Sequence, residues 1–376
     1  MKVFNVATIA DIHFNAIPAE RMYTQLESGF LHYVYKHKLD MVVIAGDLYD
    51  SIISYNSRAA HLSIEFIKRL IEVSVHSGVR YIRILKGTSS HDNNQLINLK
   101  VFESEHRLSF RIISTVEKEE IEGMKVLYIP EEYMKDVQAY YEPYLDETYD
   151  MIFGHGMFKE TSFGASKQES AITLSGAPVF DSKRMCSICK GFINFGHIHT
   201  SCSIRDKITY TGSYSRWVFG EEEKKGFLVT GYDPETGNFA NEFIENENAE
   251  YYDTLTKVDI DRYVTNPKVL CDEIDMANRG HLRVILVLEG DKNYSLVVNF
   301  LKEYYSKNKS VVLKITDRTQ VQREVESEEK LNALMEKYGF IFSDNVSHAE
   351  KISKFIKIRD KRDVSVDKVK DILSLV

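Results

Sequence analysis

Five β-strand-like apolar runs of this sequence end in aspartate and histidine, residue types that bind metal ions and transfer protons. The strand-end groups are Asp11-Ile12-His13, Gly46-Asp47-Leu48-Tyr49-Asp50, Ser90-His91-Asp92, Gly154-His155-Gly156 and Gly196-His197-Ile198-His199. Sites in open α/β sheets form where loops leave the carboxyl ends of strands, so we expect these groups to lie together. Each group is common by chance, and a short G-D-x-x-D is often only a turn. Their order and shared placement nevertheless favour one site.

Several carboxylates and imidazoles at one site suit two-metal hydrolysis. Two divalent cations about 3.5–4 Å apart activate a hydroxide and stabilise both the attacking and the leaving oxygen. Such a centre needs one carboxylate that bridges both ions, while imidazole and carboxylate groups fill the remaining positions. Mixed nitrogen and oxygen ligands suit manganese, iron or zinc better than calcium. The residue types therefore predict a hydrolase with two divalent metal ions.

The elements that must position these groups alternate between strand and helix up to about residue 155. The strand candidates are VFNVATIA, MVVIAG, YIRILKG, KVLYIP and MIFGHG. Between the second and third, Leu62, Phe66, Ile67, Leu70 and Ile71 recur at spacings that indicate a helix. Continuous apolar strand runs are typical of strands that are buried on both faces. We therefore expect an α/β layer structure.

The pattern changes in the second part of the chain. Residues 190–245 read as β-strands with turn signals such as DPETGN between them. The polar segment 245–253 then precedes a second α+β unit, in which HLRVILVLEG and SVVLKIT are strand candidates and NYSLVVNFLKEYYSK a helix. After residue 330 the chain becomes charged and helical to its end.

The strand-end motifs, in this order, resemble those of the calcineurin-like metallophosphoesterases. Residues 211–227, TGSYSRWVFGEEEKKGF, narrow the resemblance, because they are similar to a GSxxRxxFGExxxKGF stretch of the SbcD nuclease family. The superfamily resemblance covers roughly residues 1–245. It implies a four-layer α-β-β-α metallophosphoesterase sandwich with a small α+β capping domain and a helical C-terminal tail. The domains expected are a dimetal nuclease domain at 1–250, a capping domain at 254–320 and the tail at 330–376.

The resemblance also implies a role for each strand-end residue. Asp11, His13 and His199 would bind one metal ion together with Asp47, and Asp47 would bridge to a second ion bound by His155 and His197. His91 matches the catalytic histidine that acts on the leaving oxygen. Asp50 and Asp92 would support the site by orienting a ligand or His91. For Asp92, a helix N-cap or turn acceptor is an equal alternative.

The histidine loop KGTSSHD departs from the family pattern. The family has an asparagine directly before the catalytic histidine, and its amide oxygen binds the second metal ion. Here Ser90 precedes His91, and two extra residues separate Gly87 from His91. A neutral serine hydroxyl is a weaker ligand, so we expect Ser90, water or a backbone carbonyl to hold the second ion loosely.

The activity implied by the resemblance is that of a manganese-dependent DNA nuclease, with magnesium as the alternative ion. It would be a 3′→5′ exonuclease on duplex ends and an endonuclease on single strands and hairpins, serving DNA repair, recombination and replication. Two other interpretations stay open. One is a metallophosphoesterase for small phosphoesters or phosphoproteins, against which the segment 211–227 counts. The other is a scaffold subunit with a weakened site, supported only by Ser90.

The chain end predicts a protein partner. Residues 351–362, KISKFIKIRDKR, interleave basic and apolar residues, and VDKVKDILSLV places its apolar residues along one helical face. Two such helices pack either on their own domain or in the groove of a partner. The resemblance favours the coiled-coil base of an SbcC-type ATPase, and it also implies homodimerisation. The basic run is also a candidate contact with DNA, but a solvated helix face is the commoner explanation.

Composition limits the remaining possibilities. The formal net charge of −8 argues against a protein that wraps nucleic acid by charge alone, but not against local binding of a phosphodiester through metal ions. No apolar run approaches the roughly 18 residues of a membrane span. The four cysteines are expected to be reduced thiols in the cytoplasm of a bacterial or phage-infected cell. Cys186 and Cys189 form a C-x-x-C without a convincing fourth zinc ligand, which favours ordinary small apolar residues.

Overall fold

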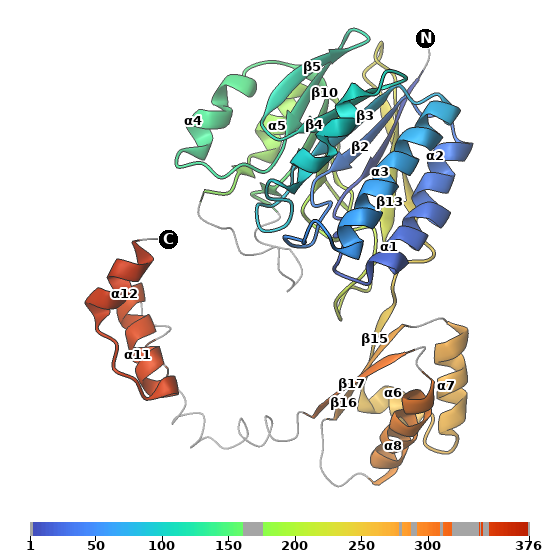
Figure 1. Cartoon of the computed structure of the whole chain (residues 1–376), viewed down its shortest axis with the longest axis vertical. Coiled ribbons are helices and arrows are strands. Elements are labelled where there is room, and N and C mark those ends of the chain that lie inside the picture. The colour runs from blue at the N-terminus through green and yellow to red at the C-terminus, as the bar shows by residue number, and fades with distance from the viewer. Residues whose placement is uncertain are drawn as a thin grey trace. The chain divides into compact units, whose positions relative to one another are not determined.

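The computed structural model describes residues 3–160, 176–277, 280–286, 292–308, 311–317, 338, 340 and 346–374. The chain divides into two compact units, Met1–Asp253 and Thr254–Val376 (Figure 1). Part of the predicted tail, at 330–337, 339, 341–345 and 375–376, lies outside the described residues. The roles predicted for the capping domain and the tail stay predictions.

Two six-stranded sheets form the frame of the first unit. The first has the order β14-β13-β1-β2-β3-β4, and the second has the order β11-β12-β10-β7-β6-β5. The strands of the first sheet are β1 (Phe4–Ile9), β2 (Met41–Ala45), β3 (Tyr81–Leu85), β4 (Ser109–Ile113), β13 (Gly226–Tyr232) and β14 (Phe239–Glu245). Those of the second are β5 (Glu117–Ile121), β6 (Met124–Ile129), β7 (Tyr149–His155), β10 (Cys189–Gly196), β11 (Cys202–Ile204) and β12 (Ile208–Tyr210). A short pair, β8 (Met157–Phe158) and β9 (Val179–Phe180), lies apart from both.

Parallel pairing brings the ends of the central strands to one edge of each sheet. Strands β1 to β4 pair in parallel along the first sheet. In the second sheet β6, β7, β10 and β12 are also parallel neighbours. The outer strands β14 and β13 continue the first sheet in antiparallel pairing, as β5 and β11 do in the second. The carboxyl ends of β1, β2 and β3 therefore lie side by side, as do those of β6, β7 and β10.

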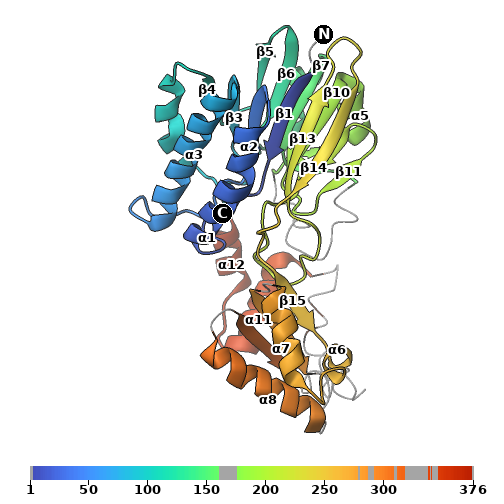
Figure 2. The ribbon, with the colours of Figure 1, turned by 90° about the vertical axis from the view of Figure 1, so that its right-hand side faces the viewer.

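Each sheet is covered on both faces, which explains the continuous apolar runs. In β2, Met41, Val43 and Ala45 pack between the two sheets, whereas Val42 and Ile44 pack toward helices. The helical layer on the first sheet contains α1 (Ala19–Leu26), a π-helical turn (Glu27–Leu31), α2 (His32–Lys36) and α3 (Arg58–Ser77) (Figure 2). Helices α4 (Val137–Tyr141) and α5 (Ser182–Ile188) contribute to the core on the second sheet, and 3₁₀ turns span Gln95–Ser104 and Glu142–Tyr144. The predicted four-layer α/β sandwich is confirmed.

The second unit begins with a three-stranded sheet. Its order is β15-β16-β17, formed by Tyr252–Leu255, His281–Leu286 and Val312–Asp317. The apolar core of this sheet includes residues of α6 (Lys257–Asp261), α7 (Pro267–Met276) and α8 (Lys292–Lys307). Two further helices follow, α11 (His348–Asp360) and α12 (Val366–Leu373), and Ser353 Oγ donates a hydrogen bond to the carbonyl of Val364 between them. Among the described residues no helix is both long and apolar enough to cross a bilayer.

Candidate dimetal centre

Tight loops at the strand ends turn the predicted residues toward one place. Asp11, His13, Asp47 and His197 all have positive φ angles, of 47°, 51°, 50° and 94°. Such left-handed backbone is uncommon for residues with a Cβ atom, and it is found preferentially at functional sites. The loops after β1 and β2 are joined directly, because Asp47 O accepts hydrogen bonds from the amides of Ile12 and His13.

Two glycines allow these loops to approach one another. A Cβ atom on Gly46 would lie 2.2 Å from Nδ1 of His155, and one on Gly87 would lie 2.1 Å from Oδ1 of Asp47. Both separations are far below van der Waals contact. Gly46 and Gly87 are therefore needed for close packing of the site.

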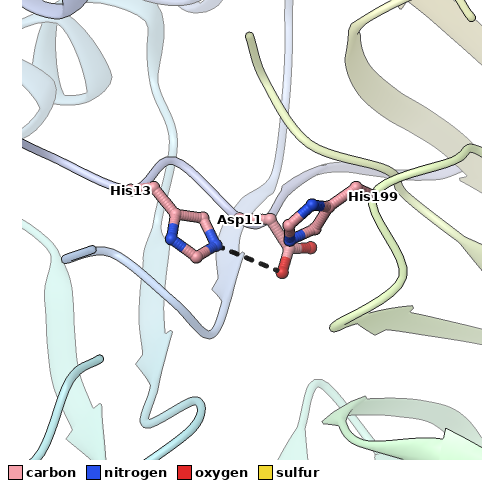
Figure 3. A group of neighbouring side chains, drawn as sticks. All are labelled: Asp11, His13 and His199. Atoms are coloured by element: carbon pink, nitrogen blue, oxygen red, sulfur yellow. Dashed lines mark ion pairs between the residues drawn. The ribbon is translucent and has the colours of Figure 1, made fainter. Parts of the chain in front are cut away.

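The first group of candidate ligands consists of Asp11, His13 and His199 (Figure 3). One ligand atom from each lies within 4.8 Å of the others. Nε2 of His13 is 4.0 Å from Oδ1 of Asp11 and 3.7 Å from Oδ2 of Asp47. Both carboxylates and the imidazole are almost completely buried. The Asp11 carboxylate is itself held by the amide of His197, at 3.0 Å.

The His13 ring provides a test of whether a cation fits here. Its Nε2 is buried and makes no hydrogen bond to any residue that the structure describes. A buried polar atom without such a partner is costly, and here it faces two carboxylates. An imidazole nitrogen and carboxylate oxygens around one point are the donor set that manganese or zinc accepts. These residues fit a divalent cation.

Asp50 and His91 lie on the other side of His13. Oδ1 of Asp50 is 3.4 Å from Nδ1 of His13, so the carboxylate can orient the imidazole whose Nε2 faces the first group. The main-chain carbonyl of Asp50 contacts Nδ1 of His91. The rings of His13 and His91 lie 4.7 Å apart, which brings the predicted catalytic histidine to the edge of the centre.

The second group consists of Asp47, His155 and His197. Nε2 of His155 lies 3.3 Å from Oδ2 of Asp47, while its Nδ1 is 2.8 Å from the carbonyl of Ala45. That carbonyl can only accept, so it fixes the tautomer that leaves Nε2 free to act as a ligand. The same oxygen of Asp47 faces both His13 and His155. Asp47 thus stands between the two groups, where a bridging carboxylate is required.

Thr88 rather than Ser90 lies beside the second group. Oγ1 of Thr88 is 3.3 Å from Oδ2 of Asp47, 3.4 Å from Nε2 of His155 and 3.5 Å from Nδ1 of His197. Ser90 is exposed to solvent. The physical reason is the length of the loop: Thr88 directly follows Gly87 at the strand end, and the two extra residues carry Ser90 outward. Thr88, and not Ser90, is therefore the residue of this loop that faces the second group.

Glu131 is a buried carboxylate of this group that the sequence reasoning missed. It follows Pro130 at the end of β6, and its Oε2 lies 3.3 Å from Nδ1 of His197 and 3.6 Å from Nε2 of His155. The sequence does contain a pattern that points to Glu131, because KVLYIP is a predicted strand and Glu131 is the first acidic residue after it. The strand-end rule that found the other residues applies here as well.

Asp92 holds the loops beneath the centre. Its carboxylate accepts hydrogen bonds from the amides of Asp47, Tyr49 and Gly87, at 3.0, 3.1 and 2.7 Å. Burial and the neighbouring Asp47 carboxylate raise the pKa of Asp92 to about 7. Of the two alternatives for this residue, the structure therefore shows an acceptor of backbone amides that ties two strand-end loops together.

The segment 211–227 packs around the first group. Oε1 of Glu221 lies 3.3 Å from Nδ1 of His199, and Nζ of Lys225 donates hydrogen bonds to the carbonyl of His199 and to Oγ of Ser213. The Trp217 ring lies 4.4 Å from the ring of His13 and 4.8 Å from that of His199. The most specific motif of the sequence therefore orients a candidate ligand and shields the centre.

Electrostatics keep the carboxylates ionised. Burial alone would raise the pKa of Asp47, but the adjacent imidazole of His155 lowers it well below the usual range. Burial likewise opposes ionisation of Glu131, but its hydrogen bond with His197 lowers that pKa. For His199, burial lowers the pKa and the contact with Glu221 raises it, with a net increase. The lowered pKa values of Asp47 and Glu131 thus keep negative charge at the second group.

The cysteines contribute nothing to these groups. All four are free thiols, and Cys189 is buried in the core of the second sheet, against which Cys186 and Cys202 pack. Burial raises the pKa of Cys189 to about 12, as expected of an inert core thiol. Each of the candidate metal groups among the described residues contains histidine and aspartate only.

Comparison with known proteins agrees with the motif resemblance. No family model matches the chain. The chain is 25% identical over 234 residues to a protein of Staphylococcus epidermidis that is named as the SbcD component of the nuclease SbcCD. The match covers 57% of this chain and 60% of that relative, so the chain spans less than two thirds of the relative's length. The similarity to SbcD-type nucleases, predicted from the motifs, is confirmed as a distant one.

Proposed function

We propose that the chain is a metal-dependent phosphodiesterase that cleaves DNA, acting as the nuclease subunit of an SbcCD-like complex. The observation that carries the proposal is the position of Asp47, whose Oδ2 lies within 3.7 Å of a histidine from each group. A carboxylate shared between two imidazole-containing groups is what a dimetal hydrolase needs. The similarity to an SbcD-type nuclease supports a nucleic acid as the substrate, and the motif resemblance narrows it to DNA.

In this proposal Asp11, His13 and His199 hold one ion with Asp47, and His155 and His197 hold the second. When bound, two ions supply a nucleophile at neutral pH and neutralise charge on the phosphoryl oxygens. Manganese is the ion we propose, with magnesium as the alternative, because the ligands are nitrogen and oxygen. The contribution of Asp50 is to hold His13 in place.

His91 is proposed as the proton donor to the departing 3′ oxygen. The carbonyl of Asp50 accepts a hydrogen bond from Nδ1 of His91, so Nδ1 carries a proton that it does not give to the substrate. Nε2 of His91 is the nitrogen that can donate a proton to the substrate. A positioned general acid of this kind contributes about 10²–10⁴-fold to a rate. The ring lies next to that of His13, close to the centre but more exposed than the buried ligands.

The finer properties rest on the resemblance. They are 3′→5′ exonuclease activity on duplex ends, endonuclease activity on single strands and hairpins, and roles in DNA repair, recombination and replication in the cytoplasm of a bacterial or phage-infected cell. The domain roles proposed are the nuclease at 1–250, the cap at 254–320 and the tail at 330–376. Helices α11 and α12 would bind an SbcC-type ATPase, and Ile352, Ile372 and Leu373 are exposed apolar residues on them. A homodimer is part of the same proposal.

The test is cleavage of end-labelled linear duplex DNA by the purified chain. Manganese and magnesium are compared, with and without an SbcC-type partner, and Asp47→Ala serves as the inactive variant. Cleavage by the parent that is lost in Asp47→Ala supports the proposal. If no condition yields cleavage, or if Asp47→Ala cleaves as well as the parent, the proposal is wrong. Turnover of p-nitrophenyl phosphate without DNA cleavage would favour the small-phosphoester alternative.

A further inference from the structure

The Glu131 side chain is held so that one oxygen faces the second group of ligands. Its exposed fraction is only 2%. The Tyr133 hydroxyl donates a hydrogen bond to Oε1 at 2.7 Å, and the Thr88 hydroxyl donates one to Oε2 at 3.1 Å. Oε2 also lies 3.3 Å from His197 and 3.6 Å from His155. Tyr133 thus fixes Oε1 of Glu131, while Oε2 lies beside the candidate ligands His155 and His197.

A buried carboxylate in this position needs a positive charge. Burying an unpaired ion costs several kcal/mol, and hydroxyl donors compensate only part of that cost. Among the described residues, the ion-pair partners of Glu131 are the imidazoles of His155 and His197. Imidazoles must be neutral to bind a metal ion. Once they do so, only the cation itself can balance the charge of Glu131.

We propose that Glu131 is a ligand of the second metal ion, in the place for which the resemblance implied an amide. The inference rests on the proposed function, because it presumes a dimetal centre. The second ion would then be held by Asp47, Glu131, His155 and His197, with Thr88 donating its hydroxyl hydrogen bond to Glu131. The Thr88 hydroxyl is too weak a ligand to replace an amide oxygen. The Glu131 carboxylate at the end of β6 would restore the number of ligands to the second ion.

The exchange of an amide for a carboxylate changes the charge of the centre. The loaded centre carries one net positive charge less than it would with a neutral amide ligand. The second ion is therefore expected to bind tightly despite the altered histidine loop. This reverses the expectation drawn from Ser90, which was loose binding of the second ion.

The experiment is a manganese titration followed by the electron paramagnetic resonance signal of free Mn²⁺, which needs no substrate. The parent chain is expected to bind two ions. Glu131→Ala should weaken the second ion by at least about tenfold, and Glu131→Gln should weaken it less because an amide oxygen remains. The matched control is Glu132→Ala, because Glu132 is also buried but accepts hydrogen bonds from the amide of Val116 and the hydroxyl of Tyr140. It should still bind two ions.

Thermal unfolding separates a ligand from a structural carboxylate. With EDTA, Glu131→Ala should melt lower than the parent, because the hydroxyls of Tyr133 and Thr88 and the imidazole of His197 lose this carboxylate partner. Addition of manganese should raise the Tm of Glu131→Ala by less than it raises the Tm of the parent. A lower Tm in EDTA with an undiminished manganese increment would mean that Glu131 is structural and would overturn the inference. If Glu131→Ala does not fold, the same comparison is made with Glu131→Gln.

The outcomes distinguish this inference from the proposed function. Two-ion binding in the parent without DNA cleavage would contradict the proposed function and leave the assignment of Glu131 intact. DNA cleavage by the parent together with unchanged two-ion binding in Glu131→Ala would contradict the inference alone. Loss of the second ion in Glu131→Ala, with the Glu132→Ala control unchanged, supports it.

Discussion

Oε1 of Glu221 lies 3.3 Å from Nδ1 of His199, and the Glu221 side chain is almost completely buried. Glu221 and His199 come from different parts of the sequence motif, since Glu221 belongs to the segment 211–227 and His199 ends G-H-x-H. A carboxylate on the far nitrogen of a ligating imidazole fixes its tautomer and raises its basicity. Through this contact the segment 211–227 supports a candidate ligand of the G-H-x-H motif.

Glu221→Gln is expected to weaken manganese binding at the first group by about 10–100-fold, because His199 loses its orienting carboxylate. The measurement is the same Mn²⁺ titration, with Glu222→Gln as the control, since Glu222 is exposed to solvent. Equal affinities in the two variants would show that Glu221 does not act through His199.

The histidine loop provides a second prediction. Ser90→Asn should leave manganese affinity unchanged, since Ser90 is exposed, whereas Thr88→Val should weaken it by removing the hydroxyl between Asp47 and Glu131. Valine keeps the shape and the backbone amide, so the comparison isolates the hydroxyl. A lowered manganese requirement in Ser90→Asn would restore Ser90 as the position that faces the second ion.

Asp92→Ala should destabilise the fold even without metal. The variant loses three hydrogen bonds from backbone amides, each worth about 1 kcal/mol, so the free energy of unfolding should fall by about 3 kcal/mol. Urea denaturation in EDTA measures this, with Asn94→Ala as the control because Asn94 is exposed. A change within 0.5 kcal/mol, on the order of an ordinary surface substitution, would contradict the role given to Asp92.

The two sheets are joined by a buried ion pair whose strength depends on pH. Arg83 on β3 is fully buried and donates two hydrogen bonds to Glu119 on β5, at 2.6 and 2.9 Å, and the Tyr128 hydroxyl on β6 donates a third. Burial alone would raise the pKa of Glu119, but the Arg83 guanidinium lowers it below 4.5. The contribution of this ion pair to the free energy of unfolding should therefore be complete above about pH 4.5. It should be lost as the pH falls through the lowered pKa of Glu119.

Glu119→Gln leaves Arg83 buried without its counter-charge, so we expect a loss of about 3 kcal/mol in the free energy of unfolding at pH 7. The difference between variant and parent should shrink on acidification, as the parent's own Glu119 becomes protonated. Urea denaturation between pH 7 and pH 3 measures both effects. A difference that stays constant with pH would contradict the assignment to this ion pair.

Residue order alone predicted the layered fold and most of the aspartates and histidines that lie in the candidate groups. Apolar runs of strand length that end in aspartate or histidine are local patterns, and parallel pairing necessarily brings such ends to one edge of a sheet. From their places along the chain, Asp11, Asp47 and the later histidines could therefore be expected to lie together. The continuous apolar runs of β1 and β2 likewise indicated strands that are buried on both faces.

Tertiary structure decided the contacts that depend on the path of a loop or on the approach of distant segments. Two extra residues in the histidine loop place Thr88 at the centre and leave Ser90 exposed to solvent. The spacing of residues in the sequence does not show which of these two side chains faces the centre. Glu131 contacts the imidazole of His197, which is 66 positions away in the sequence. Glu221 contacts the imidazole of His199, which is 22 positions away. The strand pattern can locate Glu131 at the end of β6, but its contact with His197 depends on the pairing of β6, β7 and β10, and the contact of Glu221 with His199 depends on the path of the segment 211–227.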